Sequence, residues 1–139
     1  MWYNLIMKTV FTNGCFDILH RGHIDYLERS RNLGDRLIVG INSDASVRRL
    51  KGNSRPIHNE EDRRYMLQSI RWVDHVYIFD EDTPYKLIER IQPDILTKGG
   101  DYSLAHIVGR DVAKVTIALN SVKGYSTTDI IKRICDGTT

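Results

Sequence analysis

Long apolar runs are missing from this sequence of 139 residues. Its uninterrupted apolar stretches, such as residues 37–39, are far shorter than the roughly 20 residues needed to cross a bilayer. The first residues also lack a basic segment followed by an apolar stretch and a small-residue cleavage site. We therefore expect a cytoplasmic protein without a membrane span.

Cysteine and proline are scarce. The two cysteines, Cys15 and Cys135, lie far apart, and in a reducing compartment we expect both to be free thiols. The sequence contains no Pro-, Gly- or Ser-rich linker, no repeat and no low-complexity tract. These features predict a single domain over residues 1–139.

A strong excess of charge of one sign is also missing, since the formal net charge is only +2. That value does not by itself indicate a nucleic-acid partner. The basic side chains are nevertheless concentrated in residues 48–64, where Arg48, Arg49, Lys51, Arg55, Arg63 and Arg64 surround an acidic stretch at 60–62. This run is either a solvated surface or a polyanion site for a triphosphate or a sugar phosphate.

Short β-type runs alternate with longer helical stretches along the whole chain. The expected strands are residues 8–12, 36–41, 72–79, 94–97 and 113–119, and the expected helices are 23–33, 45–50, 60–70, 84–91 and 127–135. Such alternation predicts an α/β fold: a doubly wound, five-stranded parallel sheet with helices on both faces. Ligands bind at the carboxyl ends of such strands, which here precede the loops after Thr12, Ile41, Thr97 and Leu119.

The loop after the first strand carries the most specific chemistry. Asn13 and Gly14 make a sharp turn where the backbone can approach a phosphate, and the next helix opens with His20, Gly22 and His23. A helix N-terminus attracts anions, and two imidazoles beside it can donate hydrogen bonds to the same anion. This arrangement suits a triphosphate whose α-phosphorus gains charge during displacement.

Two other interpretations of these histidines remain open. Either ring could be an ordinary structural histidine, and Cys15 with His20 and His23 could ligate a metal ion. No fourth ligand lies nearby at a usual spacing, so we predict no metal site made of protein ligands.

Residues 12–23 resemble the signature of the cytidylyltransferase-like superfamily, whose members are Rossmann-like nucleotidyltransferases with a His-x-Gly-His motif. Further similar blocks at 33–39, 42–44, 50–56, 98–102 and 124–128 extend the resemblance from about residue 8 to residue 134. The blocks 50–56 and 98–102 are most similar to the adenylyltransferases of ADP-heptose synthesis.

The resemblance implies a role for each matching residue. It implies that His20, His23 and Lys51 are catalytic. It implies nucleotide contacts from Thr12, Asn13, Gly14, Cys15, Phe16, Asp17, Gly22, Arg63, Lys98, Gly99, Ser126 and Thr127, and acceptor contacts from Asp17, Lys51, Gly100 and Asp101. On their own, Asp17 could instead brace a turn, and residues 98–101 could be an ordinary strand-ending turn.

The reaction implied is attack by a sugar 1-phosphate, D-glycero-D-manno-heptose 1-phosphate, on the α-phosphorus of ATP, which gives ADP-heptose and pyrophosphate. A phosphate monoester is already anionic, so no general base is required. Mg²⁺ would be held mainly by triphosphate oxygens, and the resemblance further implies a homodimer that binds no nucleic acid.

Other functions are compatible with parts of the pattern. Glycerol-3-phosphate cytidylyltransferases carry an arginine where this chain has Ser121, which argues against CTP. FMN or ethanolamine phosphate could replace the sugar phosphate as the acceptor. A non-catalytic nucleotide- or RNA-binding module using the basic run of residues 48–64 is the alternative from a different class.

Overall fold

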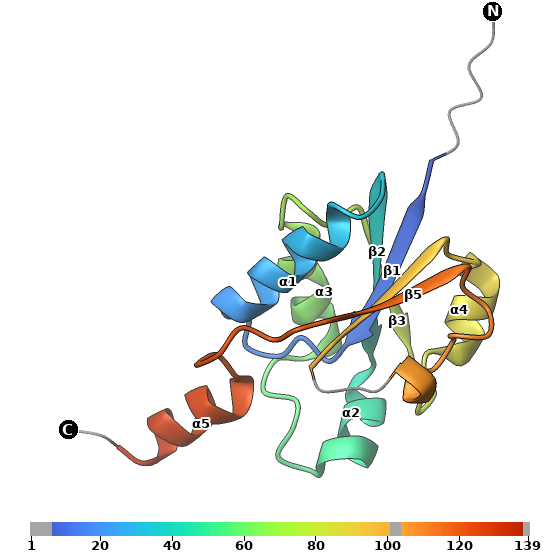
Figure 1. Ribbon diagram of the computed structural model, residues 1–139. Helices are drawn as coiled ribbons and strands as arrows, with labels where there is room; N and C mark the ends of the chain where they lie inside the picture. The colour runs from blue at the N-terminus through green and yellow to red at the C-terminus, as the bar shows by residue number, and fades with distance from the viewer. Residues whose placement is uncertain (1–6, 101–103, 138–139) are drawn as a thin grey trace, which may run out of the picture.

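The computed structural model describes residues 7–100 and 104–137 and shows a parallel β-sheet covered by helices on both faces (Figure 1). The strands are β1 (Thr9–Gly14), β2 (Arg36–Asn42), β3 (His75–Phe79), β4 (Ile95–Gly99) and β5 (Val115–Leu119). The helices are α1 (Arg21–Arg31), α2 (Asp44–Lys51), α3 (Glu60–Gln68), α4 (Tyr85–Ile91) and α5 (Thr127–Cys135), with a 3₁₀ turn η1 (Leu104–His106). This confirms the predicted fold class.

The strand order is β3-β2-β1-β4-β5, with every pairing parallel. From β1 the chain moves outward through β2 to β3, then returns to the other side of β1 to form β4 and β5. The segments that follow β1 and β4 therefore pack on opposite faces of the sheet. The carboxyl ends of these two neighbouring strands border a crevice. This crevice is where the sequence placed the candidate site.

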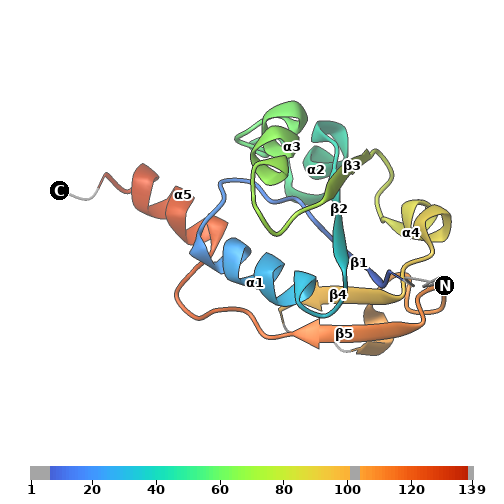
Figure 2. The ribbon, with the colours of Figure 1, turned by 90° about the horizontal axis from the view of Figure 1, so that it is seen from above.

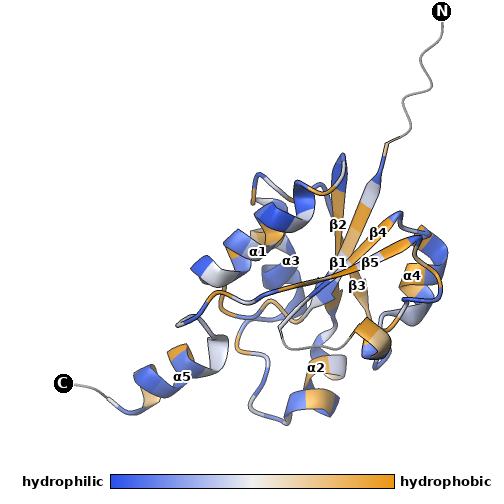
Figure 3. Ribbon diagram, in the orientation of Figure 1, coloured by the Kyte–Doolittle hydropathy of each residue, from blue (hydrophilic) through white to orange (hydrophobic). Residues whose placement is uncertain are grey.

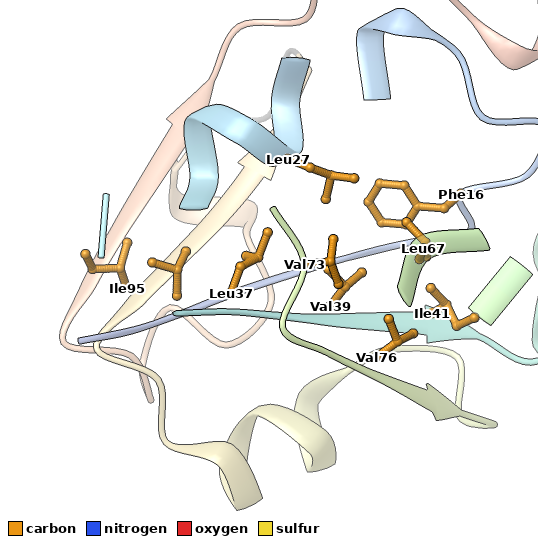
Figure 4. Packing of buried hydrophobic residues seen from close by; sticks show 10 residues of the cluster. Phe16, Leu27, Leu37, Val39, Ile41, Leu67, Val73, Val76 and Ile95 are labelled. Atoms are coloured by element: carbon orange, nitrogen blue, oxygen red, sulfur yellow. The ribbon is translucent and has the colours of Figure 1, made fainter. Parts of the chain in front are cut away.

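Two apolar clusters fix the helices to the sheet. Alternate residues of β2 point to opposite faces, so Leu37 and Val39 join one cluster with Leu27 of α1 and Leu67 of α3 (Figure 4). Ile38 joins the other cluster, which holds α4 and the segment after η1 against the opposite face. Figure 3 shows the consequence, since the strands are mostly apolar while the helices are polar on their outer sides.

Helix α5 is the exception to this layered packing. It extends away from the sheet in both orthogonal views (Figure 2), and none of its residues is buried. Only its N-terminal end reaches the crevice. Within the described residues, no helix is both long and apolar enough to cross a membrane.

Several element boundaries differ from those expected. β1 continues to Gly14 rather than ending at residue 12, and α1 begins at Arg21 rather than at 23. The second difference arises because His20 is the N-cap in extended backbone, a position where sequence patterns favour Ser, Thr, Asp or Asn. The third strand is shorter than expected because residues 71 and 72 form a turn.

Candidate active site

A cavity of about 420 Å³ opens at the carboxyl ends of β1 and β4. Segments far apart in the sequence supply its walls: the β1–α1 loop, the end of α2 with the following loop, the end of β4, and the N-terminus of α5. Its lining includes Asn13, Gly14, Cys15, Phe16, Asp17, His20, Gly22, His23, Lys51, Lys98, Gly99, Gly100, Ser126 and Thr127. The structure thus brings together most of the residues singled out from the sequence.

Two of the predicted residues do not line the cavity. Thr12 is fully buried behind the cavity, where its hydroxyl contacts the Tyr26 hydroxyl and donates to the Thr97 carbonyl at 3.1 Å. Arg63 is also fully buried and does not line the cavity. Asp101 lies outside the described residues.

The two histidines form one stacked unit at the start of α1. Their ring centroids are 3.8 Å apart, and the backbone N–H of His20 donates to Nδ1 of His23 at 3.2 Å. Because Nδ1 of His23 accepts this hydrogen bond, the proton of the neutral ring resides on Nε2, which can donate to a ligand. A Cβ added to Gly22 would lie 3.0 Å from the His20 ring, so glycine permits the stack.

Both histidines are neutral near pH 7. Burial and, to a smaller extent, the neighbouring His20 lower the pKa of His23 to about 4, against an opposing effect of Asp17. Burial also lowers the pKa of His20. Neutral imidazoles can donate a hydrogen bond to a phosphoryl oxygen without adding a full buried charge.

Asp17 connects three segments of the site rather than pointing an unused carboxylate into it. Its two carboxylate oxygens accept the backbone N–H groups of Ile57 at 2.6 Å and His58 at 2.9 Å. Its carbonyl accepts the Thr127 hydroxyl at 2.7 Å, which joins α5 to the β1–α1 loop. The bracing role therefore describes its side chain better than a short-range turn does, since the partners are 40 residues away or more.

Arg63 of α3 also connects several segments of the site by hydrogen bonds. Its guanidinium donates to the carbonyls of Cys15, Asn42 and His58, and pairs with Asp44 at 2.9 Å. These bonds tie the loop after β1 to the end of β2 and the start of α2. Arg63 therefore holds the cavity wall in place from behind.

Two lysines supply positive charge where the cavity floor meets α2. Lys98 donates to the Asn13 side-chain oxygen at 3.0 Å, and burial lowers its pKa, with the nearby Lys51 adding to the effect. Lys51 is the exposed last residue of α2. Together the two lysines can bind an anion at this part of the cavity wall.

A second cavity of about 330 Å³ adjoins the first. The two cavities share Asn13, Gly14, Cys15, Lys51 and Lys98. Beyond this common wall, the second cavity is lined by Asn42, Leu50, Phe79, Asp82, Thr83, Pro84, His106, Ile107 and Val108. A ligand in each cavity would therefore meet the other at the two lysines.

The N-terminus of α5 closes the far end of the first cavity. Ser126 caps the helix by accepting the Asp129 N–H at 3.0 Å, and Thr127 and Thr128 follow at the rim. The first N–H groups of a helix have no intrahelical acceptor and bind anions well. This end of the cavity suits phosphate oxygens.

Sequence reasoning assigned no individual role to several lining residues, and it considered Arg55 only as one member of the basic run: Tyr26, Arg55, Val122, Tyr125 and Thr128. Tyr26 falls one turn after His23, and that spacing could have suggested it. Arg55 gave no signal beyond its charge, because only the folded loop after α2 brings it to the cavity.

Within the residues that the structure describes, no group of three or more His, Cys, Asp or Glu side chains could hold a metal ion.

Comparison with known sequences identifies a family and several similar proteins. Residues 11–133 match the family described as cytidylyltransferase-like. The chain is 58% identical over 129 residues to the "Bifunctional protein HldE" of Campylobacter concisus and 56% identical over 132 residues to that of Aliarcobacter butzleri. These matches cover 93% and 95% of the chain but only 27% and 28% of the relatives' own length.

Comparison with solved structures finds the same fold. A lipopolysaccharide core biosynthesis protein from Thermoplasma volcanium matches with a TM-score of 0.71 at 33% identity, over 86% of this chain and 99% of that one. A pantothenate synthetase from Thermus thermophilus matches with a TM-score of 0.62 at 17% identity, over 88% of this chain and 61% of that one. The second likeness concerns the fold alone.

Proposed function

The chain belongs to the cytidylyltransferase-like family and is a nucleotidyltransferase, and from this premise we propose that it joins the AMP moiety of ATP to D-glycero-D-manno-heptose 1-phosphate. The products would be ADP-heptose and pyrophosphate. The observation that carries the proposal is the stacked His20–His23 pair at the start of α1, inside a cavity flanked by two lysines. The heptose itself is suggested by the HldE relatives.

In the proposed reaction, an oxygen of the sugar phosphate attacks the α-phosphorus of ATP. A bond from that oxygen to phosphorus forms as the bond to the β-phosphate oxygen breaks, and pyrophosphate leaves with the electron pair. His20 and His23 would donate hydrogen bonds to the α-phosphoryl oxygens as their charge increases, and Lys51 would add a positive charge. The acceptor is already anionic, so the mechanism needs no proton-abstracting residue.

The nucleotide would occupy the first cavity. The backbone at Asn13, Gly14, Cys15 and Phe16, and the glycines Gly22 and Gly99, allow close approach, while Lys98, Ser126 and Thr127 supply donors. Thr12, Asp17 and Arg63 would support this site from behind through the hydrogen bonds described above. Mg²⁺ bound to the triphosphate would neutralise part of its charge.

The second cavity provides a place for the acceptor. Its phosphate would lie against Lys51, while Asn42, Asp82 and Thr83 offer oxygen and nitrogen atoms to sugar hydroxyls. Lys51 lines both cavities and remains an acceptor residue in this proposal, whereas Asp17 and Gly100 line the first cavity and not the second. Gly100 and Asp101 are kept as acceptor residues on the resemblance alone. Two cavities meeting at a shared cationic wall support in-line transfer between two bound phosphates.

We further propose a cytoplasmic homodimer without a nucleic-acid partner. The basic run offers little free charge for RNA, since Arg49, Arg63 and Arg64 lie beside the carboxylates of Asp82, Asp44 and Glu61. Size-exclusion chromatography with light scattering would measure the oligomeric state.

Pyrophosphate release over a grid of nucleotides and acceptors tests the proposed reaction. We expect turnover with ATP and heptose 1-phosphate, and its loss in a variant carrying both His20→Ala and His23→Ala. Turnover only with CTP and glycerol 3-phosphate, with FMN, or with ethanolamine phosphate would refute the heptose assignment. Full function in the double variant would refute the assigned site itself.

A further inference from the structure

Arg55 lines the first cavity, but the hydrogen bonds around Asp17 do not include its side chain. Its side chain is only 14% exposed, and it lines the first cavity next to Asp17. Nε lies 3.5 Å from the Asp17 carboxylate, yet among the described residues this buried nitrogen has no hydrogen-bond partner. Buried donors in folded proteins are normally paired, so an unpaired one in a cavity wall points to an absent ligand.

Asp17 does not fully engage this guanidinium. Its two oxygens already accept the N–H groups of Ile57 and His58 at hydrogen-bond distance. Its charge therefore attracts Arg55 without fixing it by a hydrogen bond. The Nη groups of an arginine fork can then bind two oxygens of a phosphate together.

The position of Arg55 indicates which phosphates it would meet. It lines the first cavity and is absent from the lining of the second, unlike Lys51, which lines both. Asp17, its neighbour, is also bonded to Thr127 at the start of α5. Arg55 and the α5 N-terminus therefore both lie beside Asp17, and neither lines the second cavity.

We propose that Arg55 binds the β- and γ-phosphates of the nucleotide and holds them as pyrophosphate leaves. This inference rests on the proposed nucleotidyl transfer but not on the identity of the base or of the acceptor. Electrons of the breaking bond pass to the β-phosphate oxygen, so negative charge grows where the Arg55 fork and the α5 N–H groups lie. Arg55 thus stabilises the leaving group, while His20 and His23 act at the α-phosphorus.

Calorimetric titration with inorganic pyrophosphate, ATP and AMP separates this role from others. We expect Arg55→Ala to weaken binding of pyrophosphate and ATP by about 10- to 100-fold, as expected for loss of charged hydrogen bonds, and to leave AMP binding unchanged. Arg48→Ala is the matched control, because Arg48 is an exposed arginine of α2 that lines neither cavity. Its three affinities should equal those of the wild type.

Arg55→Lys provides a second variant that keeps the charge and loses the fork, and it should bind pyrophosphate with intermediate affinity. Unchanged pyrophosphate affinity in Arg55→Ala would overturn the proposal, as would an equal loss for ATP and AMP, which a merely structural role predicts. Undetectable pyrophosphate binding by the wild-type chain would also overturn it. None of these titrations contains a heptose acceptor. A failure of the Arg55 assignment can therefore be distinguished from a failure of the proposed acceptor.

Discussion

His20 and His23 share a geometry that determines what each ring can do. Because Nδ1 of His23 accepts the His20 backbone N–H, the neutral His23 ring can only donate through Nε2. Protonation would break this hydrogen bond and place a charge beside His20. The same hydrogen bond therefore determines which nitrogen of His23 can donate to a phosphate and disfavours protonation of the ring.

The lowered pKa of His23 predicts how the free energy of unfolding depends on pH. The pKa of His23 is about 4 in the folded chain and 6.5 when unfolded, so the unfolded chain takes up the proton first as pH falls. The contribution of His23 is therefore complete above about pH 6.5 and is lost towards pH 4. After a discount for partial exposure, this loss is about 2 kcal/mol.

Urea unfolding of wild type and His23→Asn at several pH values would measure this loss. Asparagine can accept the His20 N–H but does not titrate, so the difference in unfolding free energy between the two proteins should shrink between pH 6.5 and pH 4. Parallel stability curves would contradict the assigned protonation state.

Gly22 gives a second prediction at this scale. In Gly22→Ala the new Cβ would lie 3.0 Å from the His20 ring and from Tyr125, so the ring must move. Displacement of a group at the reacting centre should lower kcat/KM by about 10- to 100-fold. The melting temperature should not fall, since alanine is favoured over glycine within a helix.

Gly34→Ala serves as the contrast to Gly22→Ala. Its Cβ would lie 2.8 Å from the Lys8 carbonyl, away from the cavity, so it should lower the melting temperature and leave the histidines in place. A Gly22→Ala variant with wild-type kcat/KM would show that the histidine stack does not require glycine.

At the scale of elements, Arg63 is the main connection between the loops that form the cavity. Its removal would leave the Cys15 and Asn42 carbonyls without their donor and Asp44 without its partner. We expect Arg63→Met to reduce the free energy of unfolding by about 3–5 kcal/mol, the usual loss when one member of a buried ion pair is removed.

Arg64→Met is the matched control, because Arg64 is the next residue of α3 and forms an exposed pair with Glu61. Its unfolding free energy should change by less than about 1 kcal/mol. If Arg63→Met kept its stability and lost only nucleotide affinity, Arg63 would be a direct ligand of the nucleotide instead of a support.

At the scale of the whole molecule, the sequence predicted the sheet, its helices and the site edge because these follow from local patterns. Apolar runs mark the strands, and the residues that follow them collect at one edge of a parallel sheet. Asn13, Gly14 and the His20–His23 motif are adjacent in sequence, so their proximity was predictable.

The remaining parts depend on contacts between distant segments. Asp17 meets residues 57 and 58, and Arg63 reaches back to Cys15, through loop conformations that no local pattern specifies. The same holds for Arg55, which became a cavity residue only once the loop after α2 was in place. Charge alone could not separate the fully buried Arg63 and the cavity residue Arg55 from Arg48 and Arg64.

The central claim is that this chain transfers AMP from ATP to the phosphate oxygen of a heptose 1-phosphate. The most direct test is mass spectrometry of the products formed from equal amounts of ATP and CTP with heptose 1-phosphate labelled by ¹⁸O in its phosphate. The account predicts ADP-heptose that retains every labelled oxygen, together with unlabelled pyrophosphate. A CDP-sugar, label in the pyrophosphate, or no sugar nucleotide at all would contradict it.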